Sequence, residues 1–293
     1  MSVGTSTVTK VETDAGRFPF ERAAVIGLGL IGGSVARDLA ARGVRVSAYD
    51  ADRRQLEAAL GDGVIAESLD ATLAGANDAE LVVVAVPVDR ALGVLERVAP
   101  HARGASLVTD VGSTKAAIVA GASALGLSDR FVGSHPMAGD HRSGWSASRA
   151  GLFEGARVYL CRADETPVST VDRAASLWRG LGALPASMRA DEHDRHLAWT
   201  SHLPHIISTM LALTLAEGRV RRDDLGPGGR DMTRLAGSSA EMWTAIASEN
   251  GAAIDAALAA AASRLAEFRD LLQRSDTESL HRRFADARAW FDA

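Results

Sequence analysis

The chain has 293 residues, a length that suggests about two domains, and its 47% apolar and 24% charged residues are typical of a globular protein. Its net charge of -5 at pH 7 excludes the basic excess of a duplex-binding surface, so no nucleic-acid partner is expected. The single cysteine, Cys161, excludes an intrachain disulfide and a cysteine-based zinc site, and it fits a cytoplasmic location.

Residues 1–20 contain small polar residues and no apolar export signal, and we expect a flexible tail there. From residue 21 to residue 188, short β-branched runs alternate with helical stretches, which predicts a Rossmann-type, doubly wound and mostly parallel sheet in an α/β domain. The strands are expected at Ala23–Ile26, Val44–Tyr49, Leu81–Val86, Ser106–Asp110, Phe131–Gly133, Arg157–Cys161 and Ala183–Met188. The helices are expected at Ile31–Arg42, Arg53–Leu60, Asp89–Val98, Thr114–Leu125 and Val168–Leu181.

Residues 189–293 carry no strand-like run and are rich in Ala, Leu and Glu, which predicts an all-helical C-terminal domain with a break at 226–229. These helices have more apolar surface than one Rossmann face covers, and we expect a homodimer through this domain. The most continuous apolar run of the chain, Leu81–Val88, is far shorter than the ~20 residues that cross a bilayer, so no membrane association is expected.

A glycine-rich motif follows the first predicted strand and opens a predicted helix. It consists of Gly27, Leu28, Gly29, Leu30, Ile31 and Gly32. Its glycines allow a tight turn, the close approach of a pyrophosphate, and packing of the helix against the strand. The free N–H groups at the start of that helix favour phosphate, so the motif predicts a dinucleotide site.

The cofactor predicted from this pattern is NAD. Asp50 lies 18 residues beyond Gly32 at the end of the second strand, where a carboxylate accepts hydrogen bonds from ribose hydroxyls and repels a 2′-phosphate. Arg53 and Arg54 could pair with such a phosphate, which keeps NADP as the alternative. The pair Val86 and Pro87 follows the central strand at the edge where a doubly wound sheet binds its ligands.

Further motifs come in a fixed order along the chain. They are DVGSTK at Asp110–Lys115, SHPMAG at Ser134–Gly139, SHLPH at Ser201–His205, RDMTRLA at Arg230–Ala236, and EMW ending at Trp243. Together with the glycine motif, they make the chain resemble the prephenate and arogenate dehydrogenases of tyrosine biosynthesis over nearly all of residues 22–250. The resemblance implies a Rossmann domain joined to a helical domain through which subunits pair.

The reaction implied by this resemblance is the NAD-dependent oxidative decarboxylation of prephenate to 4-hydroxyphenylpyruvate and CO2. The alternatives are the conversion of arogenate to tyrosine and the oxidation of an amino-substituted prephenate. In each case a hydride leaves the ring carbon that bears the hydroxyl, the hydroxyl loses its proton, and loss of CO2 makes the ring aromatic. This chemistry needs a base at the hydroxyl and cationic groups for the carboxylates.

The resemblance assigns the base to His135, whose imidazole titrates near neutral pH. The alternative is a structural histidine whose hydrogen bonds are made within a tight His-Pro turn. Ser113 matches a serine beside the substrate hydroxyl and the nicotinamide, and it could equally cap the helix near Thr114.

The remaining substrate contacts are also implied by the resemblance. Arg234 matches an arginine that binds a substrate carboxylate, although it could pair with Asp231 on a helix surface. His205 matches a histidine that contacts the substrate side chain, and Trp243 matches a tryptophan of the pocket wall or is a core residue. Asp140 stands where relatives carry a different residue, and its carboxylate could pair with the ammonium of arogenate.

Three other interpretations fit the sequence less well. His193, His196, His202 and His205 form two H-x-x-H pairs, but a nine-residue offset turns a helix by about half a turn, so no metal site is predicted. A β-hydroxyacid or imine reductase shares the expected fold but lacks the paired SHPMAG and SHLPH motifs. A dinucleotide-sensing module would not need Ser113, His135 and Arg234 together.

Overall fold

The computed structural model describes residues 18–139 and 142–293. The candidate residue Asp140 therefore lies outside the described residues, as do residues 1–17 of the expected tail. The chain divides into two compact units. Unit one runs as far as His196 and also takes in Gly237–Glu249, and unit two comprises Leu197–Ala236 and Asn250–Ala293.

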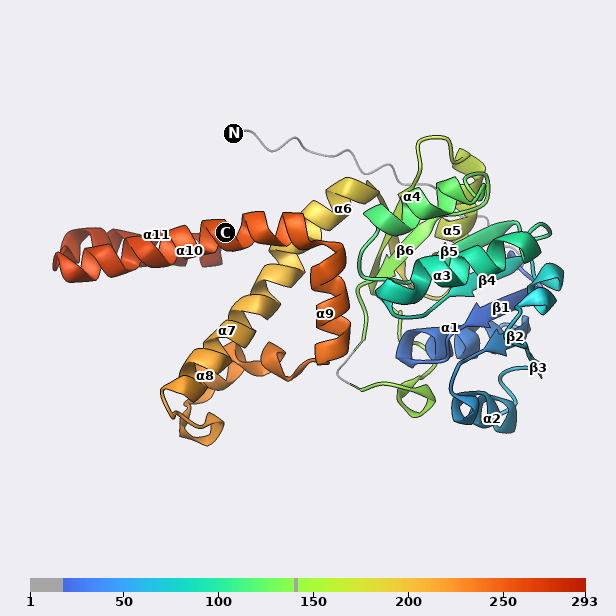
Figure 1. Cartoon of the computed structure of the whole chain (residues 1–293), viewed down its shortest axis with the longest axis horizontal. Helices are drawn as coiled ribbons and strands as arrows, with labels where there is room; N and C mark the ends of the chain where they lie inside the picture. The colour runs from blue at the N-terminus through green and yellow to red at the C-terminus, as the bar shows by residue number, and fades with distance from the viewer. Residues whose placement is uncertain (1–17, 140–141) are drawn as a thin grey trace. The chain divides into compact units, whose positions relative to one another are not determined.

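Unit one contains a parallel five-stranded sheet with the strand order β3-β2-β1-β4-β5 (Figure 1). Its strands are β1 (Arg22–Ile26), β2 (Arg45–Tyr49), β3 (Glu67–Ser68), β4 (Leu81–Val84) and β5 (Leu107–Asp110). The order reverses between β1 and β4, which is the switch point of a doubly wound fold and confirms the predicted class. The two-residue β3 was not expected, since it has no hydrophobic pattern of its own.

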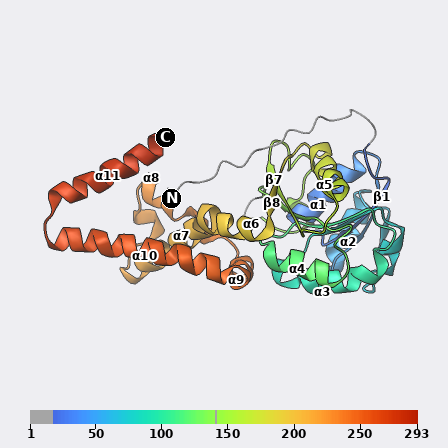
Figure 2. The same cartoon turned by 90° about the horizontal axis from the view of Figure 1, so that it is seen from above.

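Helices cover both faces of this sheet (Figure 2). They are α1 (Leu30–Ala40), α2 (Arg53–Gly61), α3 (Val88–Val98), α4 (Ala116–Ala124) and α5 (Val168–Gly180). Because successive strand residues face opposite sides, Ala23 and Val25 pack in the core with α1 and α5, whereas Ala24 and Ile26 pack with α3 and α4. This double coverage explains why the central strands read as continuous apolar runs.

A second sheet in unit one has the order β6-β7-β8. Its strands are β6 (Gly133–Pro136), β7 (Arg157–Arg162) and β8 (Leu184–Arg189). The expectation of one mostly parallel sheet was incomplete here, because β6 runs antiparallel to β7. The strand predicted at Phe131–Gly133 was also misplaced, since β6 continues through His135 and Pro136. A proline is tolerated because β6 is an edge strand of this sheet.

The remaining helices are α6 (Ala190–Leu197), the π-helix η4 (Ala198–His202), α7 (Leu203–Glu217), α8 (Pro227–Met232), α9 (Ala240–Glu249), α10 (Gly251–Gln273) and α11 (Thr277–Asp292). Helix α9 belongs to unit one and packs against α3. In unit two, α10 and α11 pack together, with Arg283 of α11 bound to Glu267 of α10. None of the helices in the described part of the chain combines the length and the apolar character that a bilayer crossing requires.

Candidate active site

The glycine motif forms the turn between β1 and α1. Gly27 has a φ of +99°, and a Cβ there would lie 2.3 Å from the carbonyl oxygen of Ala85. A Cβ on Gly32 would lie 2.0 Å from the carbonyl oxygen of Gly27, so both positions must be glycine for the turn, the helix and the neighbouring strand to pack. A Cβ on Gly29, in contrast, would meet nothing within 4 Å. Gly29 therefore faces open space, where a ligand can approach the backbone.

The start of α1 fits an anionic ligand. Gly29 is its N-cap, no side chain caps the helix, and its first turn contains no acidic residue. The N–H groups there are available to a phosphate and carry the positive end of the helix dipole. At the end of β2, the Asp50 carboxylate accepts hydrogen bonds from the N–H of Leu28, at 2.6 Å, and from the N–H of Asp52, at 2.8 Å. These residues fit a dinucleotide, with its pyrophosphate at α1 and a ribose at Asp50.

The other residues predicted at this edge lie around the turn. Val86 follows β4, and its Cγ1 is 3.2 Å from the position of a Cβ on Gly27. Pro87 is the N-cap residue of α3. On α2, the Arg54 guanidinium binds Asp52 through both its Nε and Nη2 atoms, each at 3.0 Å, and these bonds hold the pKa of Asp52 at about 2. Arg54 is thus engaged within its own turn, while Arg53 is exposed at the start of α2.

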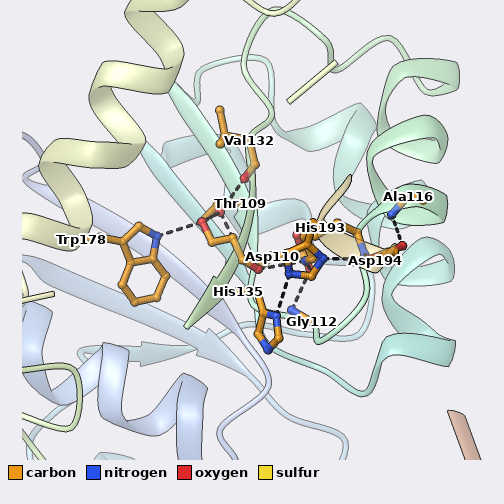
Figure 3. A network of polar contacts seen from close by, with 11 residues as sticks. Thr109, Asp110, Gly112, Ala116, Val132, His135, Trp178, His193 and Asp194 are labelled. Atoms are coloured by element: carbon orange, nitrogen blue, oxygen red, sulfur yellow. Dashed lines mark hydrogen bonds and ion pairs between the residues drawn. The ribbon is translucent and has the colours of Figure 1, made fainter. Parts of the chain in front are cut away.

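His135 is the first member of a hydrogen-bonded chain of side chains (Figure 3). It is 8% exposed on β6, and its Nδ1 lies 2.9 Å from Nε2 of His193 on α6. Nδ1 of His193 lies 2.8 Å from Oδ1 of Asp194. The His193 ring also packs edge-on against Tyr159 of β7, which pairs with His135 across the sheet.

The chain of contacts determines which nitrogen of each imidazole carries the hydrogen. Burial lowers the pKa of His193, so this ring is neutral. Because the Asp194 carboxylate can only accept, Nδ1 of His193 donates to it, and Nε2 of His193 must accept. Nδ1 of His135 therefore donates to His193, and the lone pair of a neutral His135 is on Nε2. His135 is thereby prepared to accept a proton at Nε2.

Asp194 connects this chain to the start of α4. Its two oxygens accept the backbone N–H groups of Lys115 and Ala116, each at 2.8 Å, so a side chain from α6 caps α4. Burial alone would raise the pKa of Asp194, but the hydrogen bonds from His193 and from these N–H groups lower it. Asp194 is therefore a carboxylate. The partly buried Ser113 lies just before the capped turn, so the loop after β5 and the His135 chain are held together.

A buried ion pair also holds the loop that carries Ser113. Lys115 and Asp110 are 0% and 1% exposed and contact each other, and the Lys115 Nζ also donates to the carbonyl oxygen of Ser134, at 2.9 Å. Asp110 accepts the N–H of Gly112 at 2.7 Å. Breaking such a pair would leave an uncompensated buried charge, so the loop that carries Ser113 is bound firmly to β6.

In unit two, the SHLPH motif places His205 on α7 directly after the π-helix. Pro204 has no N–H, so the regular helical hydrogen bonds cannot continue through it. The Ser201 carbonyl oxygen lies 3.0 Å from Nδ1 of His205. A carbonyl only accepts, which places the imidazole hydrogen on Nδ1. Burial, aided by the charge of Arg234, lowers the pKa of His205 and keeps it neutral.

Arg234 begins the short 3-10 helix Arg234–Gly237 and is exposed. This turn is bound to α7, because the N–H of Ala236 donates to the Ser208 hydroxyl at 3.2 Å. Within the described residues, Arg234 forms no ion pair with Asp231, so the structural alternative for this arginine has no geometric support. His205 and Arg234 are thus neighbours in unit two.

Trp243 lies half-buried on α9 in unit one. Its predicted role in the pocket wall stays a prediction.

The sequence analysis missed four buried residues of the site, namely Asp110, Lys115, His193 and Asp194. His193 drew attention only as a metal ligand, although the adjacent His-Asp pair in an amphipathic helix was a usable signal. Among residues 18–139 and 142–293, no cluster of three or more His, Cys, Asp or Glu side chains could hold a metal ion.

The comparisons with known proteins agree with this geometry. Residues 35–185 match the family model "Prephenate dehydrogenase, nucleotide-binding domain", and residues 189–286 match "Prephenate dehydrogenase, dimerization domain". A prephenate dehydrogenase of Bacillus subtilis is 35% identical over 275 residues, which cover 91% of this chain and 74% of that protein.

Two solved structures are similar over most of both chains. The prephenate dehydrogenase of A. aeolicus, in complex with hydroxyphenyl propionate and NAD+, has a TM-score of 0.84 and 27% identity and covers 92% of this chain and 96% of its own. The Synechocystis arogenate dehydrogenase has a TM-score of 0.80 and 28% identity and covers 92% and 99%. Both sequence motifs and fold therefore agree on one family.

Proposed function

Because the chain belongs to the prephenate dehydrogenase family, we propose that it catalyses the NAD+-dependent oxidative decarboxylation of prephenate to 4-hydroxyphenylpyruvate and CO2. The observation that carries this proposal is the His135–His193–Asp194 chain, because it supplies a neutral base of defined tautomer. Nε2 of His135 accepts the proton of the ring hydroxyl. The start of α1 and Asp50 would hold NAD+, which would supply the hydride acceptor.

The positive charge that remains on the imidazole pair is stabilised by Asp194, which lies at its far end. A base positioned in this way contributes ~10²–10⁴ in rate. Ser113, on the loop bound to the same network, orients the substrate hydroxyl. Arg234 binds a substrate carboxylate, beside the side-chain contact at His205. Trp243 contributes to the pocket wall.

The domain division we propose is 21–188 for cofactor binding and 189–293 for substrate binding and dimerisation. It is supported by the ranges of the two family models, because the nucleotide-binding model ends at residue 185 and the dimerization model begins at residue 189. The compact units of the structure differ from this division, because α9 packs against α3 and therefore belongs to unit one.

The substrate proposal is tested by offering the purified protein prephenate or arogenate and following the absorbance of the reduced cofactor. We expect the higher kcat/KM with prephenate. A higher kcat/KM with arogenate would move the assignment to arogenate dehydrogenase, the activity of the Synechocystis relative. No turnover of either compound would refute both assignments.

Cofactor preference gives a second test. We expect NAD+ to show a higher kcat/KM than NADP+, because Asp50 repels a 2′-phosphate and Arg54 is already bound to Asp52. Asp50→Ser removes the repulsion and should narrow the ratio of the two kcat/KM values, whereas Asp78→Ser, at an exposed site of the same unit, should leave it unchanged. A wild-type preference for NADP+ would contradict the proposal and direct attention to Arg53.

We further propose a homodimer formed through the helical domain, which is supported by the match to the dimerization model. Helices α10 and α11 also present large apolar side chains to solvent. They are Leu265, Leu272, Phe284, Trp290 and Phe291, each between 63% and 82% exposed. Light scattering at micromolar concentration should give a mass twice that of the 30.6 kDa chain. A monomer mass would refute the dimer.

A further inference from the structure

Residues 143–151, which we name the return segment, come after β6 in the chain. They contact both α1 and α2, the two helices next to the proposed cofactor site. Trp145 is 4% exposed, and the guanidinium carbon of Arg37 on α1 lies 4.0 Å from the centroid of its ring. Nε1 of Trp145 donates to Asp62 at the end of α2, at 2.9 Å, and Arg37 binds the same carboxylate at 2.9 Å. One tryptophan is thus fixed by α1 and α2 together.

The surface of α1 is shaped for this segment. A Cβ on Gly33 would lie 2.7 Å from Cβ of Ser148 and 3.1 Å from Cε3 of Trp145, so only glycine admits the return segment here. The glycine motif for the dinucleotide ends at Gly32, and Gly33 therefore serves a different contact. The N–H of Arg149 donates to the Ser34 hydroxyl at 3.0 Å, which adds a backbone attachment at the next residue of α1.

A continuous series of hydrogen bonds leads from the return segment to the carboxylate at the ribose position. The N–H of Trp145 donates to Oε1 of Gln55 at 2.6 Å, and Nε2 of Gln55 donates to Oδ2 of Asp52 at 3.2 Å. The N–H of Asp52 donates to Oδ1 of Asp50 at 2.8 Å. The Asp52 carboxylate can only accept, which defines the orientation of the Gln55 amide.

We propose that Gln55 and Trp145 are positioning residues that couple cofactor binding at Asp50 to the order of the return segment. This inference rests on the proposed binding of a ribose at Asp50. Ribose hydroxyls that donate to Asp50 stabilise the first turn of α2, and Gln55 transmits this order to the backbone of Trp145. Coupling between two equilibria is reciprocal, so cofactor binding and the order of the return segment stabilise each other by the same free energy.

Hydrogen–deuterium exchange measures this coupling without turnover. Saturating NAD+ should slow amide exchange in a peptide covering the return segment by about threefold or more in the wild type. Gln55→Met removes both hydrogen bonds of the amide at similar volume, and the slowing should disappear. Glu57→Met, an exposed position on the same helix, is the matched control and should retain it. Trp145→Phe keeps the ring under Arg37 and tests the segment if Gln55→Met does not fold.

Three results would overturn the inference. They are no slowing by NAD+ in the wild type, equal slowing in Gln55→Met, or a Kd for NAD+ weakened about tenfold or more in Gln55→Met, which would make Gln55 a cofactor ligand. Equal slowing together with a lower melting temperature would indicate a purely structural role for Gln55. Failure of the proposed reaction is seen separately, as absence of turnover in the wild type.

Discussion

Replacement of His135 by asparagine should lower kcat for prephenate by ~10²–10⁴ while the Kd for NAD+ stays nearly unchanged. The asparagine side chain is of similar size and polar, but it cannot take up the proton of the ring hydroxyl. The proposed cofactor contacts lie at α1 and Asp50, outside β6. Steady-state rates together with a titration of NAD+ binding measure both quantities on the same protein.

His281→Asn, at an exposed histidine of α11, is the matched control and should leave kcat unchanged. Asp194→Asn provides a second comparison, because it removes the charge that fixes the tautomer but leaves His135 in place. We expect kcat to fall on the order of 10²-fold there, with Asp191→Asn on the same helix as control. A His135→Asn enzyme with near-normal kcat would remove this residue from the mechanism.

Arg234 should determine substrate affinity. Prephenate carries two carboxylates, and removing either from water without a cation is costly, so we expect the forked guanidinium of Arg234 to bind one of them. Arg234→Gln loses both charge and fork, and Arg234→Lys loses only the fork. We expect KM for prephenate to rise in both, more in Gln, by roughly 10–100-fold or about 1.4–2.7 kcal/mol. KM for NAD+ should stay within about threefold of the wild-type value, since Arg234 belongs to unit two and the proposed cofactor contacts belong to unit one.

Arg222→Gln, at an exposed arginine earlier in unit two, is the matched control for the loss of charge. A structural role for Arg234 would instead lower the melting temperature and leave KM for prephenate unchanged. Measuring both quantities on the Lys and Gln variants separates the two roles. An unchanged KM in Arg234→Gln would exclude Arg234 from substrate binding.

The fold class was predictable from the sequence because its signals are local. A glycine turn between β1 and α1, and apolar runs alternating with amphipathic helices, leave few arrangements other than a doubly wound sheet. The extent of β6 was missed because Pro136 reads as the end of a strand. Whether a proline is tolerated depends on β6 being an edge strand, which is a property of the assembled sheet.

The site was predictable only in part, and for the same reason. His135 and Ser113 stand in motifs, whereas the partners that prepare His135 come from another part of the chain. Asp194 is separated from Lys115 and Ala116 by almost eighty positions, yet it caps their helix. No periodicity reports such a contact. The buried Lys115 likewise reads as a surface residue until its partner Asp110 is seen beside it.

The most direct test of the proposed reaction follows NADH and CO2 together in one incubation of the wild-type protein with prephenate and NAD+. Oxidation at the hydroxyl-bearing carbon makes loss of the ring carboxylate favourable, so the account predicts equal amounts of NADH and CO2 and an aromatic product. NADH formed without CO2, or CO2 released without NADH, would contradict it.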